Sequence, residues 1–247
     1  QIVYDTTRFH KYDSGAGKTR SFASYVWQLR KPKYDLVFVL KRSFSSSLLA
    51  FLTGARRRVG YAMKGSGQIM RNLLLTDKVP WQEDIHEVDS LISVLEAVDI
   101  VVPQEKRALE SWVSEAELAK VQDLGLLAPL QAAGKKMVLI HAAAAHPDKL
   151  YPLASWAALI KRLYQELDLV PVFSGDQQDV ALYQELAAQS GLQSVALNFA
   201  GRLSLRESMA LYSQMSLAVC VDSGPAHLCA AAQVPTIAIF GPTDPVR

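Results

Sequence analysis

Polar and turn residues end an apolar run near the C-terminus of the chain. Residues 216–224 read SLAVCVDSG, and the mostly small residues PAHLCAAAQ that follow have a helical pattern. If the apolar run is a strand of a parallel sheet, Asp222 and Ser223 lie at its carboxyl end, where open α/β sheets bind ligands. A helix that begins near Gly224 presents unpaired N–H groups and a partial positive charge, which favour a phosphate. His227, one turn further on, could add a hydrogen-bond donor.

Further polar positions fall on the same expected edge. Thr243 and Asp244 follow the next apolar run, PTIAIFG, and Lys149 lies in the loop HAAAAHPDKLYP after an earlier run, from which its ammonium could reach a phosphate. Because Asp222 is itself an anion, we expect it to accept backbone N–H bonds in the Ser223–Gly224 turn or to bond a sugar hydroxyl. The alternative is structural: Asp222 only caps a helix, and a lone loop lysine usually faces solvent.

A basic turn in the first half of the chain is a second candidate site. The segment GARRRVGYAMKG at 54–65 contains three arginines, of which Arg57 is the second, and Lys64. Lys41 and Arg42 end the preceding expected strand, so six cations fall within 24 residues. Guanidinium groups bind carboxylates and phosphates in a bidentate manner, so this turn could bind an anion. The alternative is a solvated surface.

Other acidic and histidine residues give weaker signals. Asp176 and Asp179 in SGDQQD could accept ribose hydroxyls, but the pattern favours a helix N-cap. His141 and His146 have no carboxylate or cysteine at metal-ligand spacing. We therefore expect no metal site.

The second half of the chain must position most of these residues on a parallel sheet. Apolar runs alternate there with helical patterns, as in a doubly wound sheet that is covered on both faces. Ser204 followed by Glu207 has the capping-box pattern of a helix start. The expected strands are 136–142, 168–175, 194–201, 216–224 and 235–241, and the expected helices are 153–167, 179–189, 204–215 and 225–233.

The first half has the same alternation but fewer elements. Residues 1–20 supply little apolar sequence beyond QIVY, so we expect this sheet to lack its first strand–helix unit. Pro129 and Gly134 predict a hinge. The sequence thus predicts an α/β protein with two Rossmann-like, doubly wound parallel-sheet domains, at 1–130 and 131–247. The expected elements of the first are helices at 22–31, 44–54 and 86–100 and strands at 34–40 and 56–62.

Composition limits the class of protein. The 247 residues are 50% apolar, which is enough to bury the core of one or two domains, and the net charge of +2 gives no case for nucleic acid as a partner. Cys220 and Cys229 lie in apolar surroundings without CxxC spacing, which is typical of buried thiols in a reducing compartment. No apolar run approaches the roughly 20 residues of a membrane span. We therefore expect a cytoplasmic protein.

Several of these motifs, in their order along the chain, resemble glycosyltransferase family 9, the lipopolysaccharide heptosyltransferases. DSGPAH at 222–227 is similar to the D-[ST]-G-x-x-H segment of that family, and PTIAIFGPTDP is similar to the segment that follows it. DKLYPLASWAALI at 148–160 resembles the family's K-x-[WY]-P loop and helix, and residues 34–61 resemble its first-domain strand, helix and basic turn. The resemblance covers most of residues 34–247.

The resemblance implies the GT-B architecture, in which the second domain holds a nucleotide sugar and the first holds the acceptor. It places Asp222, Ser223, Gly224 and His227 in the nucleotide-diphosphate pocket and makes Lys149 the group that neutralises the diphosphate leaving group. The implied reaction is an inverting, metal-independent transfer of heptose from an ADP-activated donor, with no cofactor. The implied acceptor is the anionic inner core of lipopolysaccharide, at the cytoplasmic face of the inner membrane.

The sequence departs from the family pattern in two places, and two alternatives stay open. The family's catalytic base is an Asp in a Gly-Asp motif just after the first strand, whereas the only Gly-Asp here is Gly175-Asp176, so we assign no base. AAAA at 142–145 stands where relatives often carry glycine. The alternatives are another GT-B nucleotide-sugar enzyme such as an epimerase, which has no need of the basic turn, and a non-catalytic nucleotide-binding protein, which the absent base motif favours.

Overall fold

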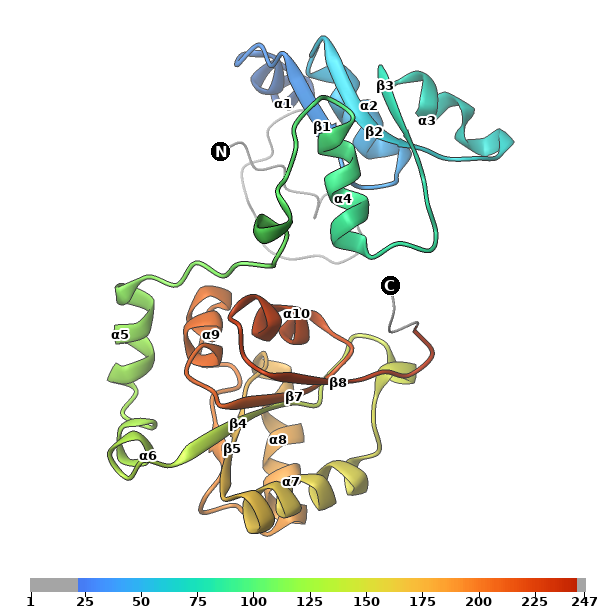
Figure 1. The fold of residues 1–247 in the computed structure, drawn as a ribbon. Coiled ribbons are helices and arrows are strands. Elements are labelled where there is room, and N and C mark those ends of the chain that lie inside the picture. Colours follow the sequence, from blue (N-terminus) through green and yellow to red (C-terminus); the bar gives the residue numbers. More distant parts are fainter. Residues whose placement is uncertain (1–21, 244–247) are drawn as a thin grey trace. The chain divides into compact units, whose positions relative to one another are not determined.

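The computed structural model describes residues 22–243, which divide into two compact α/β units (Figure 1). The first contains the described residues up to Arg107, and the second contains those from Ala108 onward. Every strand pair in both units is parallel, as the sequence predicts. The strand–helix unit expected to be missing before residue 21 falls outside the described residues.

The first unit is a three-stranded sheet in the order β1-β2-β3. Val37 and Val39 of β1 pack with Ala50 of α2, whereas Leu36 and Phe38 pack in the cluster that contains Val94 of α4. This alternation follows from the period of two residues in a strand and gives the sheet two apolar faces. The elements are α1 (Phe22–Arg30), β1 (Leu36–Val39), α2 (Phe44–Leu52), β2 (Arg57–Ala62), α3 (Ile69–Leu73), β3 (Asp77–Pro80) and α4 (Glu87–Glu96).

Two elements of the first unit, α3 and β3, are not predicted from the sequence. β3 reads DKVP, and only Val79 among its four residues is buried. An edge strand of this kind carries almost no apolar alternation, and its proline is tolerated because it ends the strand. The other elements of this unit lie where the sequence predicts them.

The second unit is a five-stranded sheet in the order β6-β5-β4-β7-β8. All five predicted strands are present, although β6 is only two residues long. Ser204 and Glu207 form the predicted capping box at the start of α9. The strands are β4 (Lys136–His141), β5 (Leu169–Phe173), β6 (Leu197–Asn198), β7 (Leu217–Val221) and β8 (Thr236–Ile239), and the helices are α5 (Glu115–Asp123), α6 (Ala128–Ala132), α7 (Leu153–Leu167), α8 (Val180–Ser190), α9 (Leu205–Tyr212) and α10 (Gly224–Ala231).

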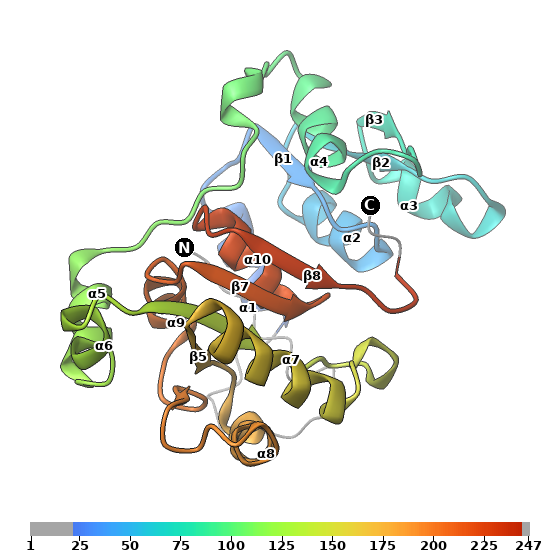
Figure 2. The same ribbon diagram turned by 60° about the horizontal axis from the view of Figure 1, so that its bottom comes forward.

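Helices cover both faces of this second sheet, with α7 and α8 on one face and α9 and α10 on the other (Figure 2). Val138 and Ile140 of β4 pack toward α7 and α8, whereas Met137 and Leu139 pack toward α9 and α10. The second face also buries Cys220 and Cys229, which are free thiols, as predicted. With both faces covered, only the strand ends and the loops that follow them are left to form a polar site.

The boundary between the units lies after Arg107 rather than after residue 130. α5 packs against α9, where Glu117 pairs with Arg206 and the Lys120 ammonium lies 3.1 Å from the Glu207 carboxylate. Val121 and Leu127 are fully buried in the α9–α10 core. Pro129 and Gly134 are interpreted above as a hinge. In the structure Pro129 lies in the first turn of the short helix α6, and Gly134 follows that helix. The helices before β4 are therefore part of the second unit.

Among the described residues, no helix combines the length and the apolar character that a membrane crossing requires.

Leu127→Ala tests the assignment of α5 and α6 to the second unit. Leu127 is 0% exposed in the core of that unit, so we expect its truncation to lower the free energy of unfolding by about 2–5 kcal/mol. Leu124→Ala, at a neighbouring leucine that is 37% exposed, is the matched control and should cost less than about 1 kcal/mol. Denaturant unfolding followed by circular dichroism measures both variants. An equal loss of unfolding free energy in the two variants would contradict this assignment.

Candidate functional site

A pocket of about 720 Å³ lies at the carboxyl ends of the second sheet. Its walls come from the loops that follow β4, β5 and β7 and from the start of α9 and α10. Four of the predicted site residues line it: Lys149, Asp222, Ser223 and Gly224. These residues are far apart in the sequence, and the shared carboxyl edge of the parallel strands brings them together.

An ion pair joins the loops after β4 and β7. Lys149 ends a short 3₁₀ turn (Pro147–Lys149), and its Nζ lies 2.6 Å from Oδ2 of Asp222. The two side chains are 25% and 16% exposed, so the pair is largely shielded from water. Nζ also lies 3.4 Å from the backbone oxygen of Asp222, which orients the ammonium over the end of β7.

Thr243 completes this contact from the end of β8. Its Oγ1 donates to Oδ2 of Asp222 at 2.7 Å, so one carboxylate oxygen accepts from both Lys149 and Thr243. The Lys149 ammonium and then the Thr243 hydroxyl lower the pKa of the Asp222 carboxyl below its ordinary value. The described bonds of the Asp222 carboxylate go to these two side chains rather than to backbone N–H groups of its own turn, and the alternative that it bonds a sugar hydroxyl stays a prediction.

The first turn of α10 presents backbone groups to the pocket. Ser223 is the N-cap, yet its Oγ donates back to the carbonyl oxygen of Val221 at 3.1 Å instead of capping the helix. Gly224 lines the pocket, and a Cβ built on it would meet no atom within 4 Å. A ligand can therefore approach the start of this helix closely, as the sequence predicts for Gly224.

His227 is a predicted site residue that lies outside the pocket lining. His227 is exposed on α10 and does not line the pocket, although its charge is a minor contribution to the lowered pKa of Asp222. Asp244 lies outside the described residues.

A buried network under the loop after β4 was missed by sequence reasoning. His141, which is 7% exposed, lies with Nδ1 2.8 Å from the carbonyl oxygen of Ser174, and Tyr183 donates to the same oxygen at 3.0 Å. Ser174 Oγ lies 3.2 Å from the Tyr212 hydroxyl. The network ties β4, β5, α8 and α9 together beneath the pocket. The only signal in the sequence was a histidine at the end of an apolar strand.

The acidic residues after β5 form the helix cap that the sequence favours. Asp176 Oδ1 accepts from the backbone N–H of Gln178 at 2.7 Å, and Asp179 Oδ2 accepts from the backbone N–H of Asp176 at 2.9 Å. Both aspartates also line the pocket. Within residues 22–243, no group of three or more His, Cys, Asp or Glu side chains is arranged to hold a metal ion.

The basic turn of the first unit does not act as one surface. Arg57 begins β2, so it lies at the amino edge of the sheet, where its Nη2 donates to Oδ1 of Asp77 at 2.7 Å. Arg58 is likewise held, by the carbonyl oxygens of Ala55 and Leu74 at 2.6 and 2.7 Å. The pair with Asp77 favours a structural role for Arg57, and the binding of a substrate by Arg57 stays a prediction. Lys64, by contrast, is exposed beyond the carboxyl end of β2.

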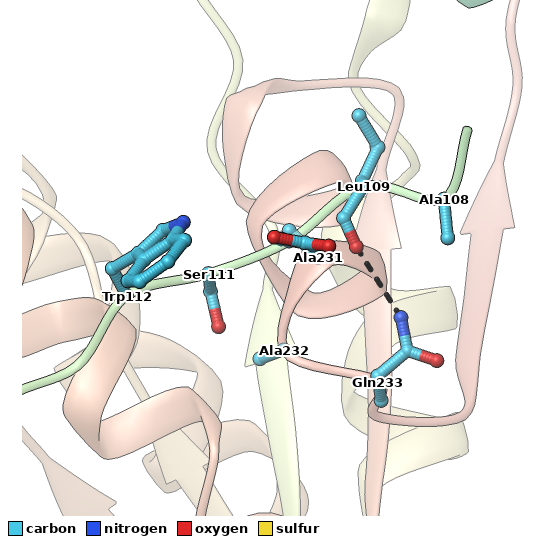
Figure 3. Close-up of a pocket in the computed structure, with 8 residues that line it drawn as sticks. Ala108, Leu109, Ser111, Trp112, Ala231, Ala232 and Gln233 are labelled. Atoms are coloured by element: carbon cyan, nitrogen blue, oxygen red, sulfur yellow. Dashed lines mark hydrogen bonds between the residues drawn. The ribbon is translucent and has the colours of Figure 1, made fainter. Parts of the chain in front are cut away.

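A second pocket, of about 530 Å³, lies at the C-terminal end of α10 (Figure 3). The segment 108–112 forms one wall, and Ala231, Ala232 and Gln233 form the other. The Gln233 side-chain amide donates to the Leu109 carbonyl oxygen at 3.4 Å across it. None of the predicted site residues lines this pocket.

Comparison with known proteins places the chain in a family. The model of Glycosyltransferase family 9 (heptosyltransferase) matches residues 23–247. The chain belongs to glycosyltransferase family 9. The predicted enzyme class, a glycosyltransferase, is thereby confirmed.

Relatives of this family 9 chain include two curated heptosyltransferases. It is 28% identical over 239 residues to lipopolysaccharide heptosyltransferase 3 of Escherichia coli, an alignment that covers 95% of this chain and 67% of that protein. It is 28% identical over 222 residues to lipopolysaccharide heptosyltransferase 2 of Salmonella typhimurium strain LT2, with coverage of 88% and 62%. The chain therefore spans roughly two thirds of the length of these relatives.

Solved structures confirm the predicted GT-B fold of this family 9 chain. The E. coli ADP-heptose lipopolysaccharide heptosyltransferase II matches with a TM-score of 0.72 and 26% identity, over 90% of this chain and 67% of that one. A family 9 glycosyl transferase from Veillonella parvula DSM 2008 matches with a TM-score of 0.74 and 21% identity, over 94% and 65%. The second likeness concerns the fold alone.

The buried His141 predicts a pH dependence of stability. Burial lowers its pKa below the ordinary 6.5, so the unfolded chain binds a proton there more readily than the folded chain does. The stability that the neutral imidazole contributes is complete above pH 6.5 and is lost as the pH falls below it. Thermal unfolding between pH 8 and pH 5 should therefore show a smaller acid loss in His141→Gln than in the parent. His227→Gln, at an exposed histidine, is the control and should follow the parent. An equal acid loss in His141→Gln would contradict the prediction.

Proposed function

We propose that the second unit binds ADP-heptose and that the protein transfers heptose to the inner core of lipopolysaccharide, with inversion and without a metal. The observation that carries this proposal is the Lys149 ammonium, held beside the start of α10 in a pocket at the carboxyl edge of the sheet. Membership of family 9 supports the reaction class, and the similarity to the E. coli ADP-heptose lipopolysaccharide heptosyltransferase II supports the donor.

Charge in the pocket orients the donor. The lining contains Lys149 and three aspartates, of which Asp176 and Asp179 follow β5 on the far side of β4 from α10. A diphosphate is repelled by the carboxylates after β5 and attracted to Lys149 and the helix start at Gly224. The donor therefore lies with its diphosphate near β7 and its nucleoside toward β5. Leu203 and Leu205, at the start of α9, also line the pocket and offer an apolar wall to the base.

Lys149 can serve the leaving group while it stays paired with Asp222. An ammonium has three N–H donors, and the described contacts of Nζ all go to Asp222. A remaining donor is free to meet a phosphate oxygen, whose charge grows as the bond to the sugar breaks. An electrostatic contact that strengthens in this way contributes on the order of 3 kcal/mol in the transition state. An inverting transfer also needs a carboxylate base on the acceptor hydroxyl, and we assign that role to no described residue.

Lys64 is the candidate residue for binding the acceptor. It lies beyond the carboxyl end of β2, the kind of edge at which α/β sheets bind ligands, and it is exposed. Phosphates or carboxylates of an anionic core oligosaccharide would interact favourably with it. A cytoplasmic location and a peripheral contact with the inner membrane stay predictions.

Lys149→Ala and Asp222→Ala test the donor site. We expect Lys149→Ala to lower the transfer rate by roughly 100-fold while it weakens ADP binding less, because the charge on the leaving diphosphate develops in the transition state. Asp222→Ala should weaken binding of the nucleotide sugar by about 1–3 kcal/mol, since it leaves Lys149 and Thr243 without their shared partner. Calorimetry with ADP and ADP-heptose, and a transfer assay, measure these effects on the full-length protein.

Lys161→Ala, at an exposed lysine on α7, is the matched control and should behave as the parent. Unchanged turnover in Lys149→Ala would contradict the proposed leaving-group role. Conversion of the donor without acceptor would favour an epimerase, and ADP binding without any turnover would favour a non-catalytic nucleotide-binding protein.

Lys64→Glu tests the acceptor site against Arg57→Glu. Reversal of a charge that meets an anionic acceptor should raise the acceptor KM by about 2–5-fold and leave the donor KM unchanged. Arg57→Glu removes the ion pair with Asp77 at the opposite edge of the sheet, so we expect it to lower thermal stability without a selective change in either KM. Steady-state kinetics in both substrates distinguish the two. If Lys64→Glu changes the KM for donor and for acceptor equally, Lys64 does not bind the acceptor.

A further inference from the structure

We infer that the loop after β8, residues 241–243, is the element that positions the leaving-group site, and that Thr243 acts on Lys149 through Asp222. This inference rests on the function proposed above. Thr243 is in this account a positioning residue, because its described contact is with Asp222.

The hydroxyl of Thr243 fixes the carboxylate on which Lys149 depends. Oδ2 of Asp222 accepts from Lys149 at 2.6 Å and from Thr243 at 2.7 Å. A carboxylate that is held by one donor alone can rotate about its terminal torsion, which has a broad energy minimum. The second donor restrains that rotation and so restrains the position of the ammonium.

Gly241 restrains the backbone of Lys149. A Cβ built on Gly241 would lie 2.6 Å from the carbonyl oxygen of Asp148 and 3.5 Å from Cα of Lys149. The backbone after β8 therefore packs directly on the backbone that carries Lys149, at a distance that only glycine permits. The loop thus restrains both ends of the lysine, its Cα through Gly241 and its Nζ through Thr243 and Asp222.

Strand pairing explains why this loop lies there. β8 pairs with β7 so that Ile239 is opposite Val221, and the backbone N–H of Asp222 donates to the Ile239 carbonyl oxygen at 3.0 Å. The residues after Ile239 are consequently carried past Asp222 at the edge of the sheet. Lysine has a large side-chain entropy, so an ammonium that is restrained before the donor binds loses less freedom in the transition state.

A double-mutant cycle on the full-length protein tests the coupling. Thr243→Val keeps the shape of the side chain and removes the donor, so we expect kcat for transfer from ADP-heptose to fall by about 10-fold with little change in the donor KM. In the Lys149→Ala background the same substitution should change kcat by less than about 2-fold, because its effect passes through the missing ammonium. Thr243→Ser restores the hydroxyl and should return kcat to within about 3-fold of the parent.

Thr236→Val is the matched control, because Thr236 lies at the other end of β8 and its hydroxyl donates to the backbone oxygen of Val234. It should leave kcat unchanged in both backgrounds. Equal losses for Thr243→Val with and without Lys149, or a failure of Thr243→Ser to restore kcat, would overturn the inference, since a merely structural defect is additive.

A second measurement needs no substrate and so separates this inference from the proposed function. The rate at which an amine-reactive ester labels Lys149, read by mass spectrometry, should rise several-fold in Thr243→Val and stay at the parent value in Thr236→Val. An unchanged rate in Thr243→Val overturns the positioning role even where ADP binds. A raised rate in a protein that binds no ADP supports the positioning role while the proposed function fails.

Discussion

The ion pair between Lys149 and Asp222 is the contact on which the site depends. It joins the loops after two strands that are neighbours in the sheet, although Lys149 and Asp222 are 73 residues apart in the chain. Thr243 adds a third loop from the next strand. A pair that is mostly shielded from water contributes little net stability, because the cost of removing both charges from water offsets their attraction. The ion pair instead fixes the position of one ammonium beside the start of α10.

The fold makes that geometry possible because it places polar loops side by side at the carboxyl edge of the second sheet. Both faces of the second sheet are covered by apolar contacts to helices, and the network of His141, Ser174 and Tyr183 anchors the floor of the pocket from inside the core. The polar loops at the carboxyl edge are thus mounted on a rigid support, as preorganised electrostatic stabilisation requires. The pair is neutral as a whole, so the attraction for a diphosphate comes from its orientation and from the helix start.

Much of this arrangement follows from the sequence, and the exceptions have physical causes. Apolar runs predict every strand of the second unit, and DSGPAH correctly predicts a strand end followed by a helix at Gly224. The sequence does not reveal that Asp222 binds Lys149 and Thr243, because such contacts depend on strand order, which local patterns do not encode. The position of Arg57 at the amino edge, by contrast, follows from the predicted strand at 56–62, because Arg57 lies at its start. The unit boundary was misplaced because Pro129 and Gly134 are typical both of hinges and of short helices.

A structure of the protein with ADP bound is the most direct test of this site. We expect the diphosphate to lie within hydrogen-bonding distance of Lys149 Nζ and of the backbone N–H of Gly224 at the start of α10, while Nζ remains in contact with Asp222 and Thr243 still donates to the same carboxylate. A diphosphate bound beside Asp176 and Asp179, or anywhere out of reach of Lys149, would contradict this expectation.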